Sequence, residues 1–140
     1  MKILLDTNIL SEVRRPTPDI RVLAWLEDLD EDRAFISVVS IAEIRREIAL
    51  MSDGRRRESL AHWLAEDLTQ RFDQRLLPVD QAVALAWGDL MGVAKRSGRG
   101  LSSMDGLIAA TAIAGELGLA TRNTKDFQGF GIEIVNPWRA

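Results

Sequence analysis

The chain opens with the stretch Ile3-Leu4-Leu5-Asp6-Thr7-Asn8, a short apolar run that stops at an acid. A strand covered on both faces of a sheet is apolar along its whole length, so this run predicts a buried strand of a parallel sheet. Similar short runs recur at 34–38, 76–79, 119–121 and 132–135. Helical patterns separate these runs, and strands that alternate with helices predict an α/β fold with a mostly parallel sheet.

The segments between the runs carry helix signals. In the second helix, Ile20, Leu23, Ala24 and Trp25 are expected to form one inward face, widened by Leu26 and Leu29. Pro78 cannot donate a ladder hydrogen bond, so the third strand is expected at a sheet edge. The predicted helices span 8–13, 19–29, 41–51, 55–72, 80 to the loop at 97–100, and 104–117.

Composition narrows the class of protein. The 140 residues carry a net charge of -3 and no cysteine. This length fits a single domain. The absence of cysteine excludes a disulfide scaffold, a thiol nucleophile and a zinc–thiolate site. The small negative charge means that any contact with nucleic acid must come from local patches. No segment approaches the roughly 20 apolar residues of a membrane span, and the first apolar run is too short for a signal peptide, so we expect a cytoplasmic protein with no membrane contact.

Four acids fall where predicted strands end or where the following helices begin. In an open parallel sheet, ligands bind beyond the carboxyl ends of the strands. Carboxylates that converge there repel one another unless a cation neutralises them. Hard oxygen ligands without a nearby His or Cys favour Mg²⁺ or Mn²⁺. The four acids are Asp6, Glu43, Asp105 and Asp126.

Three of these acids also fit a structural role at helix starts. A Ser or Asn stands three residues before each of them, which is the spacing of a capping box. The two interpretations are compatible, because a helix start also directs free N–H groups into the same cleft. Four such acids together, with no competing chemical motif, favour a metal site. The capping spacing occurs at Ser40–Glu43, Ser102–Asp105 and Asn123–Asp126.

The sequence around the four acids resembles the PIN-domain family, and most closely the VapC/FitB-like toxins of bacterial toxin–antitoxin pairs. The strings that carry the resemblance are LLDTNIL at 4–10, SVVSIAEI at 37–44, DGLIAATA at 105–112 and TRNTKDF at 121–127. Their order and spacing extend it over essentially the whole chain. It implies one PIN-like nuclease domain over 1–140, with a mostly parallel sheet flanked by helices, and the activity of a metal-dependent endoribonuclease.

The resemblance also implies roles for single residues. Asp6, Glu43 and Asp105 become ligands of Mg²⁺ or Mn²⁺, with Asp126 completing the site. Many family members carry an acid at the position of Asn123, so the choice between Asp126 and Asn123 as a metal contact stays open. Neighbouring polar side chains can orient the carboxylates by hydrogen bonds, as they do around other metal sites. These neighbours are Thr7, Asn8, Thr121 and Asn123.

An acidic site must still attract a polyanion, so basic residues are needed nearby. Lys95, Arg96 and Arg99 are the favoured phosphate contacts, because their loop leads into Asp105. Arg45-Arg46 and Arg55–Arg57 are further candidates, although a run such as Arg55–Arg57 is more often a solvated helix face. Single-stranded RNA is the expected substrate, because a cleft reaches unpaired nucleotides more easily.

Two other classes of protein remain open. An acid after an apolar strand also occurs in phosphatases with an aspartyl nucleophile, but these need a second Asp where Asn8 stands. The other alternative is a non-catalytic binding module with a degenerate acidic cleft. The resemblance further implies a homodimer and a small antitoxin partner, for which the apolar helix faces around Trp25 and Trp63 could serve.

Overall fold

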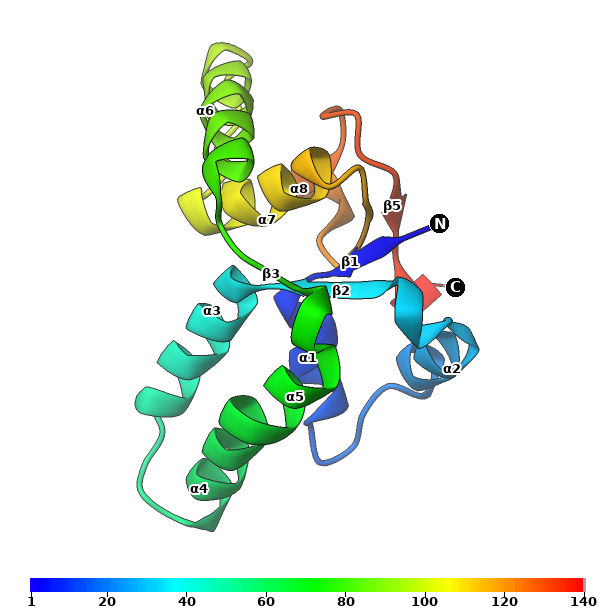
Figure 1. The fold of residues 1–140 in the computed structure, drawn as a ribbon, viewed down its shortest axis with the longest axis vertical. Coiled ribbons are helices and arrows are strands. Elements are labelled where there is room, and N and C mark those ends of the chain that lie inside the picture. Colours follow the sequence, from blue (N-terminus) through cyan, green and yellow to red (C-terminus); the bar gives the residue numbers. More distant parts are fainter. Residues whose placement is uncertain (140) are drawn as a thin grey trace.

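The computed structural model describes residues 1–139 and places a five-stranded sheet at the centre of the molecule (Figure 1). The strand order is β3-β2-β1-β4-β5, and every neighbouring pair is parallel. β3 forms an edge, as Pro78 predicts. The parallel α/β fold expected from the sequence is confirmed. The strands are β1 (Ile3–Leu5), β2 (Ala34–Ser37), β3 (Leu76–Leu77), β4 (Gly118–Ala120) and β5 (Ile134–Val135).

Apart from the start of α3 and the short α8, the helices lie close to where the sequence places them. The predicted helix at 55–72 is one continuous helical run, but a π-helical stretch at Trp63–Leu68 widens its middle. Short 3₁₀ turns occupy Glu31–Arg33, Asp73–Arg75 and Pro137–Arg139. The α-helices are α1 (Thr7–Val13), α2 (Ile20–Asp28), α3 (Val38–Ala49), α4 (Arg55–His62), α5 (Thr69–Phe72), α6 (Gln81–Arg96), α7 (Ser103–Ala114) and α8 (Thr124–Phe127).

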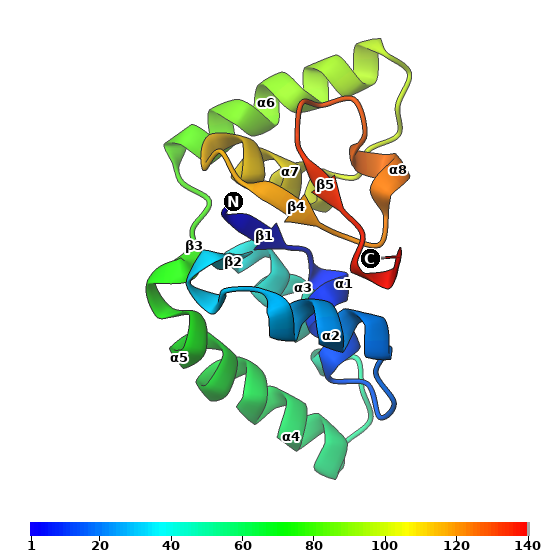
Figure 2. The ribbon, with the colours of Figure 1, turned by 90° about the vertical axis from the view of Figure 1, so that its right-hand side faces the viewer.

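The sheet separates two apolar cores. α6 and α7 lie on one side of it, and α1, α2, α4 and α5 lie on the other (Figure 2). The central strand serves both cores, because alternate side chains of a strand point to opposite faces. Leu4 packs with Ile108 and Leu119 in the core on the side of α6 and α7, whereas Ile3 and Leu5 belong to the core on the opposite side.

The structure corrects the predicted inner face of α2. Ile20 is 79% exposed and Leu23 is also exposed, whereas Val22 is fully buried. Trp25 packs partly buried against the same core. Val22 and Trp25 are three residues apart, so the buried stripe of this helix is rotated by about one residue from the predicted one. Ala114, expected at a core position of α7, is exposed.

The start of α3 is also corrected. The predicted helix began at Ile41 with Ser40 as its cap, but the helix begins at Val38, and the Ser37 hydroxyl accepts the backbone N–H of Val39 at 3.0 Å. The capping box at Ser40–Glu43 is therefore wrong. The strand passes into the helix with no intervening loop, which places Glu43 in the second helical turn and frees its side chain from a capping role.

The topology brings two distant loops together. From central β1 the chain builds β2 and β3 on one side, then crosses back to add β4 and β5 on the other. The loops after β1 and β4 consequently meet at the carboxyl edge of the sheet, where the Asp6 N–H donates to the Ala120 carbonyl at 2.9 Å. Such a switch point is where open α/β sheets bind ligands.

No helix within residues 1–139 combines the length and the apolar character that crossing a membrane requires.

Candidate active site

Asp6 lies at the centre of the carboxyl edge and is buried. Its Oδ1 accepts the Thr7 backbone N–H at 2.7 Å, and its Oδ2 accepts the Thr121 hydroxyl at 2.7 Å. Burial raises the pKa of Asp6 to about 6 despite these two hydrogen bonds, and the negative charges of Asp105 and Glu43 contribute to the rise. A neutralising cation would relieve this electrostatic cost.

Glu43 reaches the same place from α3. The Thr7 hydroxyl donates to Glu43 Oε1 at 2.7 Å and lies 2.8 Å from the Ser40 hydroxyl. Thr7 has one hydroxyl proton, which it gives to Glu43, so Ser40 must donate to Thr7. Ser40 thus supports the carboxylate through Thr7, a role that the sequence hides because Ser40 also has the spacing of a helix cap.

Asp105 enters from the first turn of α7. Its backbone N–H donates to the Ser102 hydroxyl at 3.1 Å, so the cap predicted at Ser102 is confirmed. The carboxylate itself is half-buried and lines the cleft. Burial and the nearby charge of Asp126 raise the pKa of Asp105, while the Ser102 hydroxyl opposes the rise. The cap and the cleft carboxylate therefore coexist on one residue.

The loop after β4 holds Asp6 through Thr121. While the Thr121 hydroxyl donates to Asp6, it accepts the Asn8 side-chain amide at 3.3 Å and the Asn123 backbone N–H at 3.0 Å. The side-chain oxygen Oδ1 of Asn8 accepts the Arg122 backbone N–H at 3.4 Å. Thr7, Asn8 and Thr121 thus form side-chain hydrogen bonds around the acids, whereas Asn123 takes part through its backbone.

The three acids line a cleft of about 370 Å³ together with Thr7, Asn8 and Asn123. Four charged residues in its walls were not predicted. Glu12 and Glu47 lie four residues after Asn8 and Glu43 on their helices, and residues four apart on a helix share a face, so the spacing could have revealed both. Arg122 lies inside the string TRNTKDF, whereas no pattern in the sequence indicates that Arg15 lines the cleft. The four additional residues are Glu12, Arg15, Glu47 and Arg122.

The three predicted phosphate contacts, Lys95, Arg96 and Arg99, lie outside the described walls of the cleft. Arg99 donates to the carbonyls of Gln128, Lys125 and Asp126, and its guanidinium lies 4.1 Å from the centre of the Phe130 ring. It therefore ties the loop after α6 to the segment that follows β4.

Asp126 differs from the other three acids. It is exposed and is absent from the described walls of the cleft, which instead include Asn123. Its charge is nevertheless close enough to raise the pKa of Asp105.

The donor set fits a hard divalent cation. Asp6, Glu43 and Asp105 offer only oxygen, and the carboxylate oxygens that accept hydrogen bonds keep a further lone pair for coordination. Within residues 1–139, no three His, Cys or acidic side chains already stand close enough to enclose a metal ion. The carboxylates therefore have to draw together around an ion, which would offset the cost of charging Asp6 and Asp105, the two acids whose pKa values are raised.

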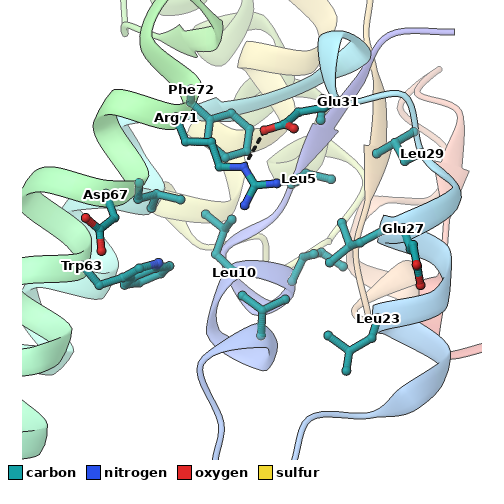
Figure 3. A pocket seen from close by; sticks show the side chains of 15 residues that line it. Leu5, Leu10, Leu23, Glu27, Leu29, Glu31, Trp63, Asp67, Arg71 and Phe72 are labelled. Carbon is teal, nitrogen blue, oxygen red and sulfur yellow. Dashed lines mark hydrogen bonds and ion pairs between the residues drawn. The ribbon is translucent and has the colours of Figure 1, made fainter.

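A larger cavity of about 570 Å³ lies between α1, α2 and the α4–α5 run (Figure 3). Its lining is mainly apolar, with Leu10, Leu23 and Trp63 around the space and the Arg71–Glu31 ion pair at one end. Its three acids, Glu27, Glu31 and Asp67, lie apart from one another, and Glu31 is paired with Arg71, so we assign the chemistry to the acidic cleft.

Comparisons with known proteins agree over nearly the whole chain. A sequence profile of the PIN domain matches residues 3–131. Toxin FitB of Neisseria gonorrhoeae is 38% identical over 136 residues, which cover 97% of this chain and 98% of that protein. VapC ribonuclease Y4jK of Sinorhizobium fredii is 38% identical over 136 residues, 97% of each chain. The crystal structure of FitAcB from Neisseria gonorrhoeae superposes with a TM-score of 0.92 at 38% identity, covering 99% of both chains.

Proposed function

Because the chain belongs to the PIN-domain family, we propose that it is a metal-dependent endoribonuclease that acts as the toxin of a toxin–antitoxin pair. The observation that carries the proposal is the convergence of Asp6, Glu43 and Asp105 in one cleft, in a chain similar from end to end to proteins named as a toxin and as a ribonuclease.

We assign a Mg²⁺ or Mn²⁺ ion to Asp6, Glu43 and Asp105. Such an ion, when bound, supplies a water of lowered pKa and offsets charge on the phosphate and the leaving oxygen. Thr7 fixes Glu43, and Thr121 fixes Asp6, so the chain holds both carboxylates in place before substrate arrives. The hydrogen-bonded frame thereby limits the reorganisation that the reaction needs.

Asp126 and Asn123 share the remaining side of the site in this proposal. Asn123 lines the cleft, and Asp126 acts on Asp105 from outside it through its charge. A comparison of Asp126→Asn with Asn123→Ala in metal-binding calorimetry would show which of the two residues supports the ion.

The partners follow from the same assignment. The substrate is RNA, the chain acts in the cytoplasm, and an antitoxin protein restrains it. We propose that the antitoxin docks an apolar segment in the cavity of Figure 3, whose wall includes Trp63 and whose rim carries Glu27 and Asp67. Solved structures of similar chains include "Structure of FitAB bound to IR36 DNA fragment", 37% identical with a TM-score of 0.91 over 97% of this chain and 95% of that chain.

The test is cleavage of single-stranded RNA with Mg²⁺ or Mn²⁺. Asp6→Asn or Glu43→Gln is expected to lower the rate at least about 100-fold, because each change removes a charged metal ligand. Glu58→Gln, at an exposed acid of α4, is the matched control and should cleave as the wild type does. Cleavage that survives a chelator, or an active Asp6→Asn protein, would contradict the mechanism.

The same preparations separate the alternatives. An aspartyl-nucleophile phosphatase would hydrolyse a small phosphate monoester, which we expect this chain not to do, because an amide occupies the position of the required second acid at Asn8. A binding module with a degenerate cleft would bind RNA without cleaving it in either metal.

A further inference from the structure

A second, smaller cavity of about 190 Å³ adjoins the acidic cleft, and both cavities have Ser11 and Glu47 in their walls. α1, α3 and α4 surround it. Ile48 and Met51 contribute an apolar side, and Trp63 lies on another. A chain that leaves the acidic cleft past Glu47 therefore meets this space next.

Two arginines, Arg14 and Arg56, outnumber the single acid Glu47 in the wall of the small cavity and leave it with a net positive charge. The guanidinium of Arg14 lies 5.2 Å from the centre of the Trp63 ring, and its buried Nε has no hydrogen-bond partner among the described residues. Arg56 donates one hydrogen bond, at 3.2 Å, to the Arg14 carbonyl and is otherwise exposed. An arginine carries five N–H donors, so both side chains retain donors for an anion.

The structure separates Arg56 from its two neighbours. Arg57 donates to the Ile48 carbonyl at 3.2 Å and pairs with Asp53, so it fastens α4 to the end of α3. Arg55 is exposed and is not among the described residues of the cavity wall. Among Arg55, Arg56 and Arg57, only Arg56 belongs to the described walls of the cavity. Arg55 therefore offers a control of equal charge one position away.

Resting on the proposed nuclease function, we propose that this cavity is a subsite for a nucleotide next to the scissile phosphate. Arg14 and Arg56 contact its phosphate, and the apolar side receives its base or ribose. The acidic cleft needs such a neighbour, because its described walls carry five acids and only two cations, Arg15 and Arg122. A bound polyanion gains affinity from each phosphate that a cation neutralises.

The decisive measurement is steady-state cleavage of single-stranded oligoribonucleotides by the wild type, Arg56→Gln and Arg55→Gln. Arg56→Gln is expected to raise KM about fivefold to tenfold, with kcat changed less than about twofold, as for loss of a charged contact made equally in the ground and transition states. Its plot of log(kcat/KM) against log salt should also be shallower by about 0.7, the value for one phosphate contact on a single strand. Arg55→Gln should match the wild type in both respects.

Substrate length supplies a second, independent readout. Removing nucleotides one at a time from either end should produce a step in KM for the wild type when the subsite loses its nucleotide. Arg56→Gln should lack that step and keep the others.

Two results would overturn the subsite. One is identical kinetic behaviour of Arg56→Gln and Arg55→Gln, and the other is a step in KM of equal size in the wild type and Arg56→Gln. If Arg56→Gln cleaves normally but escapes inhibition by the antitoxin, the cavity binds protein and the proposal is wrong. Absence of any cleavage by the wild type rejects the nuclease function itself, and this inference with it.

Discussion

At the scale of single residues, Asp6 combines two demands that oppose each other. The site needs its carboxylate charged and oriented, yet the fold buries it among other acids. The cost of burial exceeds the effect of the two hydrogen bonds, and the pKa rises from 3.8 to about 6. In the absence of metal, the charged form of Asp6 therefore destabilises the folded state.

This cost predicts a pH dependence for the metal-free protein. The folded state binds the Asp6 proton more tightly than the unfolded chain does, so the resulting stability is complete below pH 3.8 and is lost as pH rises through about 6. A shift of about two units corresponds to about 3 kcal/mol at most. In chelator, the wild type should lose more free energy of unfolding between pH 5 and pH 7 than Asp6→Asn does.

Urea unfolding at both pH values measures that difference. Asp89→Asn, at an exposed acid of α6, controls for the loss of one negative charge. Equal pH dependence in the wild type and Asp6→Asn would show that Asp6 ionises freely in the fold.

Arg99 yields a second prediction at this scale. Its side chain holds three backbone carbonyls and covers Phe130, so Arg99→Gln should lower the free energy of unfolding by about 1–3 kcal/mol. KM for RNA should stay within about twofold of the wild type, because the residue is outside the described walls of the cleft. Arg96→Gln, three residues earlier and exposed, should change neither quantity. A raised KM with unchanged stability would restore Arg99 as a phosphate contact.

At the scale of elements, a buried carboxylate joins α1 to α2. Glu12 Oε2 accepts the Asp19 backbone N–H at 2.9 Å, and Arg15 pairs with the same carboxylate at 3.2 Å. Burial by itself would raise the pKa of Glu12, but the Asp19 N–H and Arg15 outweigh it and hold the pKa below 4.5. Its contribution to stability is thus present above pH 4.5 and is lost as pH falls through the lower folded pKa.

Glu12→Ala is accordingly expected to lower the free energy of unfolding at pH 7 by about 2–3 kcal/mol, because it leaves a backbone N–H without its partner. Glu47→Ala, at an exposed acid of the same cleft, should stay within about 0.5 kcal/mol. Chemical denaturation of both variants tests this. A small effect at Glu12 would mean that water replaces the carboxylate at Asp19.

The elements also show how far sequence patterns reach. Apolar runs and helical spacing predicted every strand and the main helices, because burial dictates both patterns. The start of α3 was missed since Ser37 and Ser40 are equally good caps, and only the absence of a loop after β2 selects Ser37. The inner face of α2 was misassigned because its apolar residues extend around much of the helix. Which of them is buried depends on the partners it packs against.

For the site, the sequence predicted three cleft acids and their hydroxyl and amide neighbours, since these follow strand ends. It could not separate Arg99, which is bound to carbonyls, from Arg56, which faces a cavity. That distinction depends on contacts between segments far apart in the chain.

At the scale of the whole molecule, α6 lies at one end of the domain, packed against α7 (Figures 1 and 2). Two of its large apolar side chains are exposed to solvent: Leu85 is 65% exposed and Val93 is 42% exposed. Between them, nothing lies within 4 Å of where a Cβ would stand at Gly88 or Gly92, so another surface can approach closely. We assign this face of α6, in place of the helices around Trp25 and Trp63, to the predicted homodimer.

Size-exclusion chromatography with light scattering tests the assignment. The wild type should be a dimer at tens of micromolar, and Leu85→Glu with Val93→Glu should make it a monomer, because two buried charges from each protomer would meet across a twofold axis. Leu50→Glu, at an exposed leucine on another element, should leave the dimer intact. A monomeric wild type, or a dimeric double variant, would contradict it.

The hydrogen bond from Thr121 to Asp6 spans 115 positions of the chain, and it has a consequence during synthesis. A nascent chain can form neither this bond nor the central β1–β4 pair until β4 has left the ribosome. Folding that depends on such distant contacts waits for the late segment. A nascent chain that ends before Thr121 therefore has an incomplete acidic cleft and is expected to lack nuclease activity. Activity is expected only after β4 has emerged, which gives a co-translated inhibitor time to engage the product.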